Sequence, residues 1–309
     1  MLDSAGPSLQ EIAKGVYAWI GANGDSNAGA IATAEGVVAI DAQQTLTQAR
    51  QFRAAIGAST GLPVLSLVNT HFHLDHTAGN EAFADVPIVA HERTRTMMEH
   101  YLGPADDGRW LVSALEPKLC LFFGSNIRDL VTPGSPAEAW FVRRMSGAEY
   151  NHIVLRAPTR TFANSFTFYD CGECLRLDYW GPAHSDGDLV VQLERAKVAF
   201  LGDLMFYGRF PWLGDCDLDG WIEQLARILS LDLDIVVPGH GPVVTLAEVA
   251  EFRALLLAIR GAAANAISAG ASEEAAIQKA GLAQFEHMPR YREWMPFNVR
   301  AAYRYLKSR

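Results

Sequence analysis

The chain has 309 residues, of which 50% are hydrophobic and 20% are charged, a composition typical of soluble globular proteins rather than disordered ones. This length suits one large domain or two domains of medium size. The formal net charge is -9, from 26 basic and 35 acidic side chains. This balance argues against a nucleic-acid partner, because phosphate binding needs a concentrated basic surface.

Targeting signals, membrane spans and disulfides are all poorly represented in the sequence. The N-terminal segment MLDSAGPSLQEIAKG lacks the basic start and apolar core of a secretory signal, so we expect a cytoplasmic location. No run approaches the roughly 18 apolar residues that a membrane span needs, so we expect no membrane partner. Four cysteines are too few for a disulfide framework in a chain of this length.

The first half of the chain has the pattern of an α/β unit. Residues up to 40 contain short β-prone runs separated by glycine-containing turns, which predict strands. Residues 44–58 have apolar side chains at helical spacing and end near Gly57, which predicts a helix. The β-rich run PVLSLVNT at 63–70 leads directly into a polar loop, so we expect the chemistry at the carboxyl end of a strand.

Residues 95–160 have a different character. They contain several prolines among aromatic residues such as Trp110 and Trp140, which predicts interrupted helices rather than a regular sheet. A loop-rich, aromatic segment of this kind suits an insertion that covers a substrate. A structural elaboration or a dimer surface stays equally open.

The second half of the chain repeats the order of elements seen in the first. Residues 161–206 contain β-prone runs separated by turns, residues 220–231 have helical spacing, and residues 234–241 predict another strand. We therefore expect two similar halves that face each other. Residues from about 246 to 309 have helical spacing, and residues 298–306 predict a closing helix.

Cys171 and Cys174 form a CxxC pair in the segment YDCGECLRL, between two expected strands. No second CxxC pair and no flanking histidine accompany them, so a zinc knuckle is poorly supported. We favour reduced thiols in a hairpin turn and leave a redox or metal role open.

Three of the nine histidines, His71, His73 and His76, lie within six residues of one another, with Asp75 between them. Packing does not explain this HxHxDH spacing, because each buried polar ring would need a partner. Imidazole and carboxylate groups are ligands of zinc and related divalent ions. In an extended loop His71 and His73 point to the same side, whereas Asp75 and His76 can face a second point. The spacing therefore favours two adjacent metals over one.

Three further residues occupy settings that suit additional ligands. His184 lies in the loop GPAHSDGDLVV, Asp203 ends the strand AFLGD, and His240 lies between Gly239 and Gly241 in VVPGHGP. Glycines let the backbone turn tightly beside a site, and an unpaired carboxylate at a strand end would be unfavourable. Each residue alone is open to a structural role, but in this order and together with HFHLDH they predict a metal site.

The spaced motifs HFHLDH, HSDGD, GD after an apolar strand and PGHGP resemble those of the metallo-β-lactamase-fold hydrolase superfamily. The resemblance covers about residues 12–245 and implies an α/β fold, an αββα sandwich with the metals at one edge. It implies a single domain over residues 1–309. Within that domain, residues 95–160 would form a helical insertion and residues 246–309 would form C-terminal helices.

The family's metal ligands match positions of this chain residue by residue. The resemblance implies one zinc held by His71, His73 and His184, a second held by Asp75, His76 and His240, and a bridging Asp203. A hydroxide between the two Zn2+ ions would be the nucleophile, and the ions would polarise the substrate carbonyl. Asp75 would also accept or relay a proton, so Asp75 and Asp203 are the expected catalytic carboxylates. Iron or manganese in place of zinc stays open.

Further residues are expected around the ligands. Asp41, at the end of VVAID, resembles the family's strand-end aspartate and is expected to orient a ligand imidazole, with Thr70 and Asp188 as weaker candidates. The residues that follow Asp203 are candidates for the substrate pocket: Phe206, Tyr207, Arg209, Phe210 and Trp212. For Tyr207 and Arg209, simple packing stays equally open. Tyr207 would donate to a carbonyl oxygen, and Arg209 would bind a carboxylate.

The bridging aspartate narrows the choice within the superfamily. The β-lactamases that the chain resembles carry a cysteine or no bridging carboxylate at the position of Asp203, so β-lactam hydrolysis is only a secondary possibility. A bridging aspartate with HxHxDH resembles the glyoxalase II and lactonase branch. We therefore expect a dinuclear zinc hydrolase of a carboxylic ester, thioester or lactone.

The same motifs are also compatible with a mononuclear iron persulfide dioxygenase, which uses only one of the two metal positions. A metal-binding protein without turnover stays open as well, and it would cleave no substrate. The expected partner is a small-molecule substrate, with no nucleic acid and no membrane. A homodimer is left open.

Overall fold

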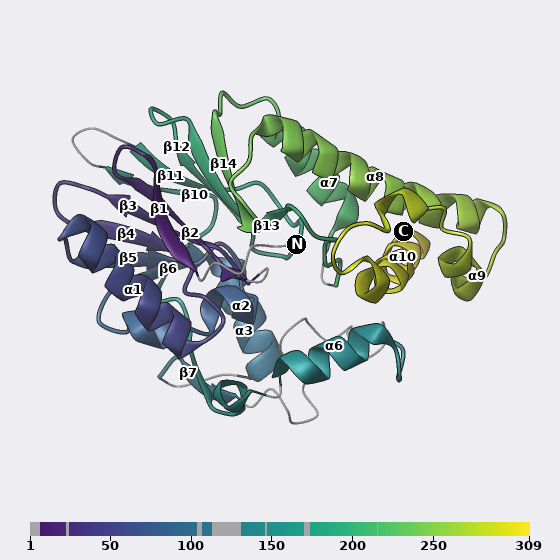
Figure 1. Ribbon diagram of the computed structural model, residues 1–309, viewed down its shortest axis with the longest axis horizontal. Coiled ribbons are helices and arrows are strands. Elements are labelled where there is room, and N and C mark those ends of the chain that lie inside the picture. Colours follow the sequence, from purple (N-terminus) through teal and green to yellow (C-terminus); the bar gives the residue numbers. More distant parts are fainter. Residues whose placement is uncertain are drawn as a thin grey trace.

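The computed structural model describes residues 7–22, 25–103, 107–112, 131–145, 147–169, 174–214 and 216–309. Its main feature is a pair of β-sheets packed face to face (Figure 1). The first sheet has the order β1 (Ser8–Ala13), β2 (Val16–Ile20), β3 (Ala28–Ala32), β4 (Val37–Ile40), β5 (Val64–Val68), β6 (Ile88–His91) and β9 (Arg160–Phe162). The second sheet has the order β10 (Ser165–Tyr169), β11 (Cys174–Tyr179), β12 (Leu189–Leu193), β13 (Val198–Phe206) and β14 (Ile235–His240).

The strands of the first sheet are apolar on both faces, because each face is covered by another layer. In β4, Val38 and Ile40 belong to the core between the two sheets, together with Phe200 and Val237 of the second sheet. The alternate residues of β4, such as Val37, belong to a different core on the outer side. This alternation follows from the two-residue period of a strand.

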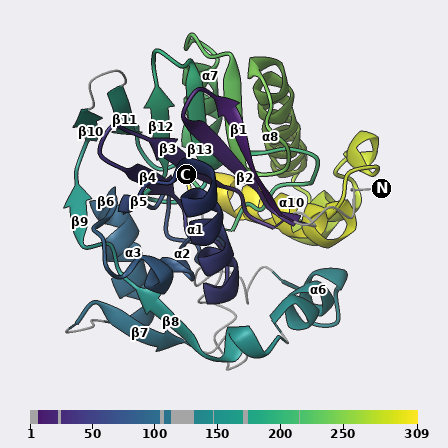
Figure 2. The same ribbon diagram turned by 60° about the vertical axis from the view of Figure 1, so that its left-hand side comes forward.

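Helix α1 (Leu46–Thr60) covers the outer face of the first sheet, and α7 (Leu218–Ile228) and α8 (Leu246–Ser268) cover the outer face of the second (Figures 1 and 2). Phe52 and Ile56 of α1 are fully buried against the sheet, and Trp221 of α7 is fully buried on the opposite side. The layers therefore stand in the order helix, sheet, sheet, helix. This is the αββα sandwich that the family resemblance implied.

The helix boundaries agree with the sequence signals. The side chain of Thr45 accepts from the backbone N–H of Gln48 at the start of α1, and Gly61 ends the helix with φ 67°. At the start of α8, Thr245 and Glu248 form a reciprocal capping box. The expected helix at 220–231 is α7, and the expected strand at 234–241 is β14.

The C-terminal segment is helical, as predicted, and it packs beside the second sheet. After α8 come α9 (Glu273–Gln278), a short η4 (Ala283–Phe285) and α10 (Tyr291–Lys307). Helix α10 packs against α8, α9 and α6 (Pro136–Met145). Asn298 of α10 is fully buried, where its side chain donates to Pro211 O at 2.9 Å and accepts from Leu213 N at 3.2 Å. The helix thus holds the segment that follows β13.

The segment 95–160 contains both helices and strands within its described parts. It begins in α3 (Glu92–Leu102) and continues through β7 (Arg109–Val112), α6, η3 (Ala148–Asn151) and β8 (Ile153–Arg156). Strands β7 and β8 form a separate antiparallel pair, a regular element that the proline-rich sequence did not predict. Whether this segment covers a substrate stays a prediction.

Only one cysteine of the CxxC pair lies within the described residues. Cys171 lies outside the described residues, and Cys174 begins β11 as a half-buried residue opposite Tyr169 of β10. The role of the pair therefore stays a prediction. Among the helices of the described ranges, none is both long and apolar enough to cross a membrane.

We predict that Asn298→Ala lowers the free energy of unfolding by about 1 to 3 kcal/mol, because two buried backbone groups lose their partner. Urea unfolding followed by circular dichroism measures the change. The matched control is Asn164→Ala, since the side chain of Asn164 is exposed. Equal stability of the two variants would show that Asn298 does not hold the segment after β13.

Candidate metal centre

Seven polar side chains meet at one edge of the sandwich, although they come from four separate segments of the chain. The motif HFHLDH follows β5 and enters the short helix α2 (Leu74–Thr77). His184 lies between β11 and β12, Asp203 lies in β13, and His240 is the last residue of β14. The parallel pairs β4–β5 and β13–β14 bring carboxyl ends of strands to the same edge. All seven side chains are buried except that of Asp75, which is 27% exposed.

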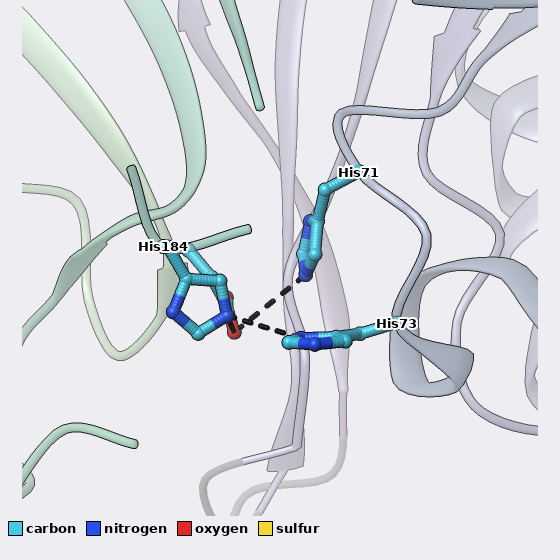
Figure 3. Close-up of side chains that lie close together, drawn as sticks. His71, His73 and His184 are labelled. Carbon is cyan, nitrogen blue, oxygen red and sulfur yellow. Dashed lines mark hydrogen bonds and ion pairs between the residues drawn. The ribbon is translucent and has the colours of Figure 1, made fainter. Parts of the chain in front are cut away.

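The first set of ligand atoms consists of three imidazoles and one carboxylate oxygen. His73 Nδ1 lies 3.0 Å from His184 Nε2, which lies 3.4 Å from Asp203 Oδ2. His71 Nε2 lies 3.9 Å from the same carboxylate oxygen. The three rings come from both sheets and point toward one another (Figure 3). All four ligand atoms lie within 4.8 Å of one another, so they form a group that could hold a metal ion.

A second set of ligand atoms lies on the other side of Asp203. Its other oxygen, Oδ1, lies 3.1 Å from His76 Nε2 and 3.4 Å from His240 Nε2. His240 Nε2 is also 3.2 Å from Asp75 Oδ2. This group is equally compact, with ligand atoms within 4.8 Å of one another. The two oxygens of one carboxylate therefore face two different ligand sets.

The environment of His71 fits a divalent metal. Its Nε2 atom is buried and has no hydrogen-bond partner, and Asp203 Oδ2 at 3.9 Å is too distant to accept one. A buried imidazole nitrogen without a partner is unfavourable. Two ligands that are each about 2 Å from one zinc ion can lie up to about 4 Å apart, so the spacing suits shared coordination. Imidazole and carboxylate donors suit zinc and related divalent ions.

Asp41 and Thr70 fix the orientation of two histidine rings. Asp41 Oδ1 accepts from Thr70 N, and Oδ2 accepts from Thr70 Oγ1, both at 2.8 Å. The Thr70 hydroxyl has only one proton, so it accepts from His71 Nδ1 at 3.1 Å. Asp41 Oδ2 also lies 2.8 Å from His76 Nδ1, which donates to it. In their neutral form both rings therefore carry the proton on Nδ1 and direct the Nε2 lone pair into the site.

Asp188 acts on the backbone that carries His184 rather than on a ligand ring. Its carboxylate accepts from Ser185 N at 2.6 Å and from Ser185 Oγ at 2.8 Å. Burial raises the pKa of Asp188 to about 6. Asp188 therefore acts on His184 through the neighbouring Ser185, whereas Asp41 binds the ring of His76 directly.

Burial and neighbouring charges act differently on the two ligand sets. Burial lowers the pKa of His71 well below its ordinary value and lowers the pKa of His184 to about 3, so both rings are neutral near pH 7. Burial, the largest single effect, acts in the same direction on His76 and His240, but the neighbouring carboxylates, Asp203 first and Asp75 with it, together outweigh burial and raise the pKa of both rings. A divalent ion in the second set would therefore displace protons from these two rings.

Glycines allow the backbone to approach the ligands closely, as the sequence indicated for Gly239. A Cβ atom on Gly239 would overlap the carboxylate of Asp203. Gly202 has φ 50°, and a Cβ atom there would overlap the side chain of Thr70. Asp203 can therefore take its position only with glycine at position 202 of β13 and at position 239 of the neighbouring β14.

Three of the five expected pocket residues lie beside His240. The ring of Phe206 stacks on the His240 imidazole, with 5.2 Å between centroids and 9° between planes. Tyr207 is half-buried and donates from its backbone N–H to His240 O at 3.0 Å. Arg209 Nη1 lies 3.3 Å from His240 Nδ1. These residues therefore form one wall of the second ligand set.

The remaining two expected pocket residues are packed into the C-terminal helices. Phe210 is fully buried, and its ring contacts that of Tyr291 at 5.2 Å. Trp212 is buried and stacks on Phe297 at 3.9 Å. Both rings therefore pack against residues of the C-terminal segment, and a role in the pocket stays a prediction for them.

Asn27 is a residue of the site that the sequence pattern did not reveal. Its backbone N–H donates to Gly239 O at 2.7 Å, and its side-chain amide donates to Pro238 O at 2.9 Å and to Gly241 O at 2.7 Å. It therefore holds the turn around His240 from the opposite sheet. A single asparagine in a polar turn gives no distinctive signal in a sequence, because asparagine is common in turns.

A family model described as Metallo-beta-lactamase superfamily matches residues 21–240. The 2,4-dinitroanisole O-demethylase subunit alpha of Nocardioides sp. (strain JS1661) is 25% identical over 233 residues, which are 74% of this chain and 54% of that protein. The linear primary-alkylsulfatase of Pseudomonas sp. (strain ATCC 19151) is 22% identical over 231 residues, 70% of this chain and 42% of that protein. The chain thus spans about half the length of these curated relatives.

Solved structures share the fold. A metallo-beta-lactamase from Pontibacter korlensis has a TM-score of 0.56 and 23% identity, over 81% of this chain and 99% of that one. The stereoselective inverting sec-alkylsulfatase Pisa1 from Pseudomonas sp. has a TM-score of 0.69 and 16% identity, over 96% of this chain and 50% of that one. Because the family model covers more than half of the residues, the chain belongs to the metallo-beta-lactamase superfamily, and its site carries donors that could hold a metal.

Proposed function

We propose that the chain holds two zinc ions and hydrolyses a carboxylic ester, a thioester or a lactone of a small molecule. The observation that carries the proposal is the position of Asp203. Its Oδ2 atom faces His71 and His184, and its Oδ1 atom faces His76 and His240. A carboxylate in this position suits a bridge between two ions, with two ligand sets that share it.

The residues of the chain have separate roles in this proposal. Bound divalent ions supply a hydroxide nucleophile near neutral pH and polarise the scissile bond. Asp41 and Thr70 hold the rings of His71 and His76 so that their lone pairs face the ions. Asp75 is the ligand carboxylate that reaches solvent, so it is placed to accept a proton from a water molecule.

A second candidate substrate is a sulfate ester. Two observations favour it: the sequence similarity to a linear primary-alkylsulfatase and the structural similarity to a sec-alkylsulfatase over 96% of this chain. The ester, thioester or lactone remains the first proposal because the bridging Asp203 with the HxHxDH motif resembles the glyoxalase II and lactonase branch. Metal content and a substrate panel separate both candidates from the iron dioxygenase and the β-lactam hydrolase that the sequence left open.

We predict that protein purified without added metal contains close to two zinc ions per chain, measured by elemental mass spectrometry. We expect this protein to cleave at least one member of a panel of carboxylic esters, thioesters and lactones. Cleavage of only a sulfate ester or only a β-lactam added to the same panel would redirect the assignment. One iron per chain with oxygen uptake on persulfides would contradict the hydrolase proposal.

We predict that Asp203→Ala reduces the metal content to one ion per chain or fewer and abolishes turnover, because each ligand set loses one oxygen of the shared carboxylate. The matched control is Asp232→Ala, since Asp232 is 82% exposed and lies on the surface. Elemental mass spectrometry and the ester panel measure the two effects. Unchanged metal content and rate in Asp203→Ala would show that Asp203 does not bridge the two ligand sets.

We predict that Asp41→Asn weakens metal affinity by about 10- to 100-fold, as is typical when a group that orients a ligand is lost. The asparagine amide has one acceptor oxygen, so it cannot accept all three hydrogen bonds that Asp41 receives from Thr70 and His76. Competition with a chromogenic chelator measures the affinity, with Asp232→Asn as the control. Equal affinity in both variants would mean that Asp41 does not orient the ligands.

A further inference from the structure

Two arginines from distant parts of the sequence lie on segments that contact each other, and one of them, Arg209, lies beside the second ligand set. Arg209 follows β13, and Arg290 immediately precedes α10. The two segments are joined by a hydrogen bond from Phe210 N to Pro289 O at 2.8 Å. The rings of Phe210 and Tyr291 are also in contact. The residues next to both arginines thus hold the two side chains in one neighbourhood, and the charge of Arg290 acts on Arg209.

Arg209 connects this pair to the metal centre. Its Nη1 atom lies 3.3 Å from His240 Nδ1, and its guanidinium carbon lies 5.6 Å from the centre of the Phe206 ring. Phe206 itself stacks on His240. Arg209 is half-buried as a whole residue and its Nε atom is fully buried, so its guanidinium group lies inside the wall of the second ligand set.

Arg290 occupies its position against several local preferences. It has φ 70°, a left-handed conformation that is uncommon for a residue other than glycine. It is the N-cap residue of α10 and makes no capping hydrogen bond with its side chain. Its positive charge lies at the positive end of the helix dipole. A residue that conflicts with local preferences in this way is expected at functional sites rather than in a purely structural turn.

The side chain of Arg290 is held but not enclosed. Its guanidinium carbon lies 5.0 Å from the centre of the Trp140 ring of α6, and Nη1 lies 3.5 Å from Glu293 Oε1. The side chain is 31% exposed. Trp140 therefore covers one face of the Arg290 guanidinium group. The N–H groups at the edge of the guanidinium can donate hydrogen bonds to a further molecule.

We propose that Arg209 and Arg290 together bind a carboxylate of the substrate, a group separate from the bond that is cleaved. This inference rests on the proposed function, because it places the cleaved bond at the two ions. Two divalent cations carry more positive charge than the carboxylates of Asp41, Asp75 and Asp203 neutralise, and the arginines add to the excess. A guanidinium group offers a planar pair of donors that matches a carboxylate. The substrate class is thus an ester, thioester or lactone of a dicarboxylic or similarly charged acid.

The test compares two esters that differ only in this charge. The 4-nitrophenyl monoester of succinic acid carries a carboxylate where 4-nitrophenyl butyrate carries a methyl group. We expect the zinc-loaded wild-type protein to have a higher kcat/KM for the succinate ester. In Arg290→Gln the ratio of the two kcat/KM values should fall by about tenfold, as is typical for a lost charge-assisted hydrogen bond. The loss should lie in KM rather than in kcat.

The matched control is Arg292→Gln, because Arg292 lies two residues further along the same helix and its side chain is 81% exposed. It should keep the wild-type ratio. Metal content is measured for every variant, and Arg209→Gln should lower the ratio as Arg290→Gln does. A wild-type preference for the butyrate ester, or an equal ratio in Arg290→Gln and Arg292→Gln, would overturn the proposal.

A second measurement separates failure of this inference from failure of the proposed function. Isothermal titration calorimetry of the zinc-loaded protein with succinate measures binding without turnover. We expect Arg290→Gln to weaken succinate binding by about tenfold and Arg292→Gln to leave it unchanged. If no ester is cleaved but this difference is found, the arginine pair stands and the reaction is wrong. If esters are cleaved but Arg290→Gln binds succinate as the wild type does, only the arginine pair is wrong.

Discussion

The buried carboxylate of Asp203 is the constraint on which the arrangement of the site depends. A negative charge inside a protein is stable only where it is paired or bound to a metal. Asp203 lies in β13, a strand of nine residues that are all buried. Its oxygens face histidines from both sheets, among them His76 on one side and His184 on the other. Packing of the sheets and completion of the ligand sets therefore depend on each other.

The same strand connects the metal centre to the C-terminal helices. The segment after Asp203 runs beneath α10, where Asn298 binds its backbone and Phe297 stacks on Trp212. In a metallo-β-lactamase fold the αββα core holds the metal ligands, so helices beyond β14 are free to shape the surroundings. In this chain they do so through Arg290, which begins α10 and lies beside the segment that carries Arg209.

The sequence predicts the helices and strands well, and it predicts which residues meet at the edge of the sandwich, because both leave local signals. Helical and strand periods indicated the helices and strands, and the short spacing from His71 to His76 indicated the first candidate ligands. Asn27 and Arg290 leave no such signal, since their contacts join segments far apart in the chain. The hydrophobic residue Trp212 was equally ambiguous, because an aromatic side chain after a metal ligand can line a pocket or fill a core. Only the three-dimensional contacts separate these cases.

With divalent ions bound, the local charge at the site would be opposite in sign to the net charge of the chain. The formal charge of the chain is -9. The carboxylates of the site already have partners, because Thr70 donates to Asp41 and His240 lies beside both Asp75 and Asp203. Bound divalent ions would leave the centre positive, with guanidinium groups beside it. Acidic side chains elsewhere are screened over about 10 Å at ordinary ionic strength, whereas a charge inside the site is screened much less. An acidic protein can therefore select a negatively charged substrate at a positively charged centre.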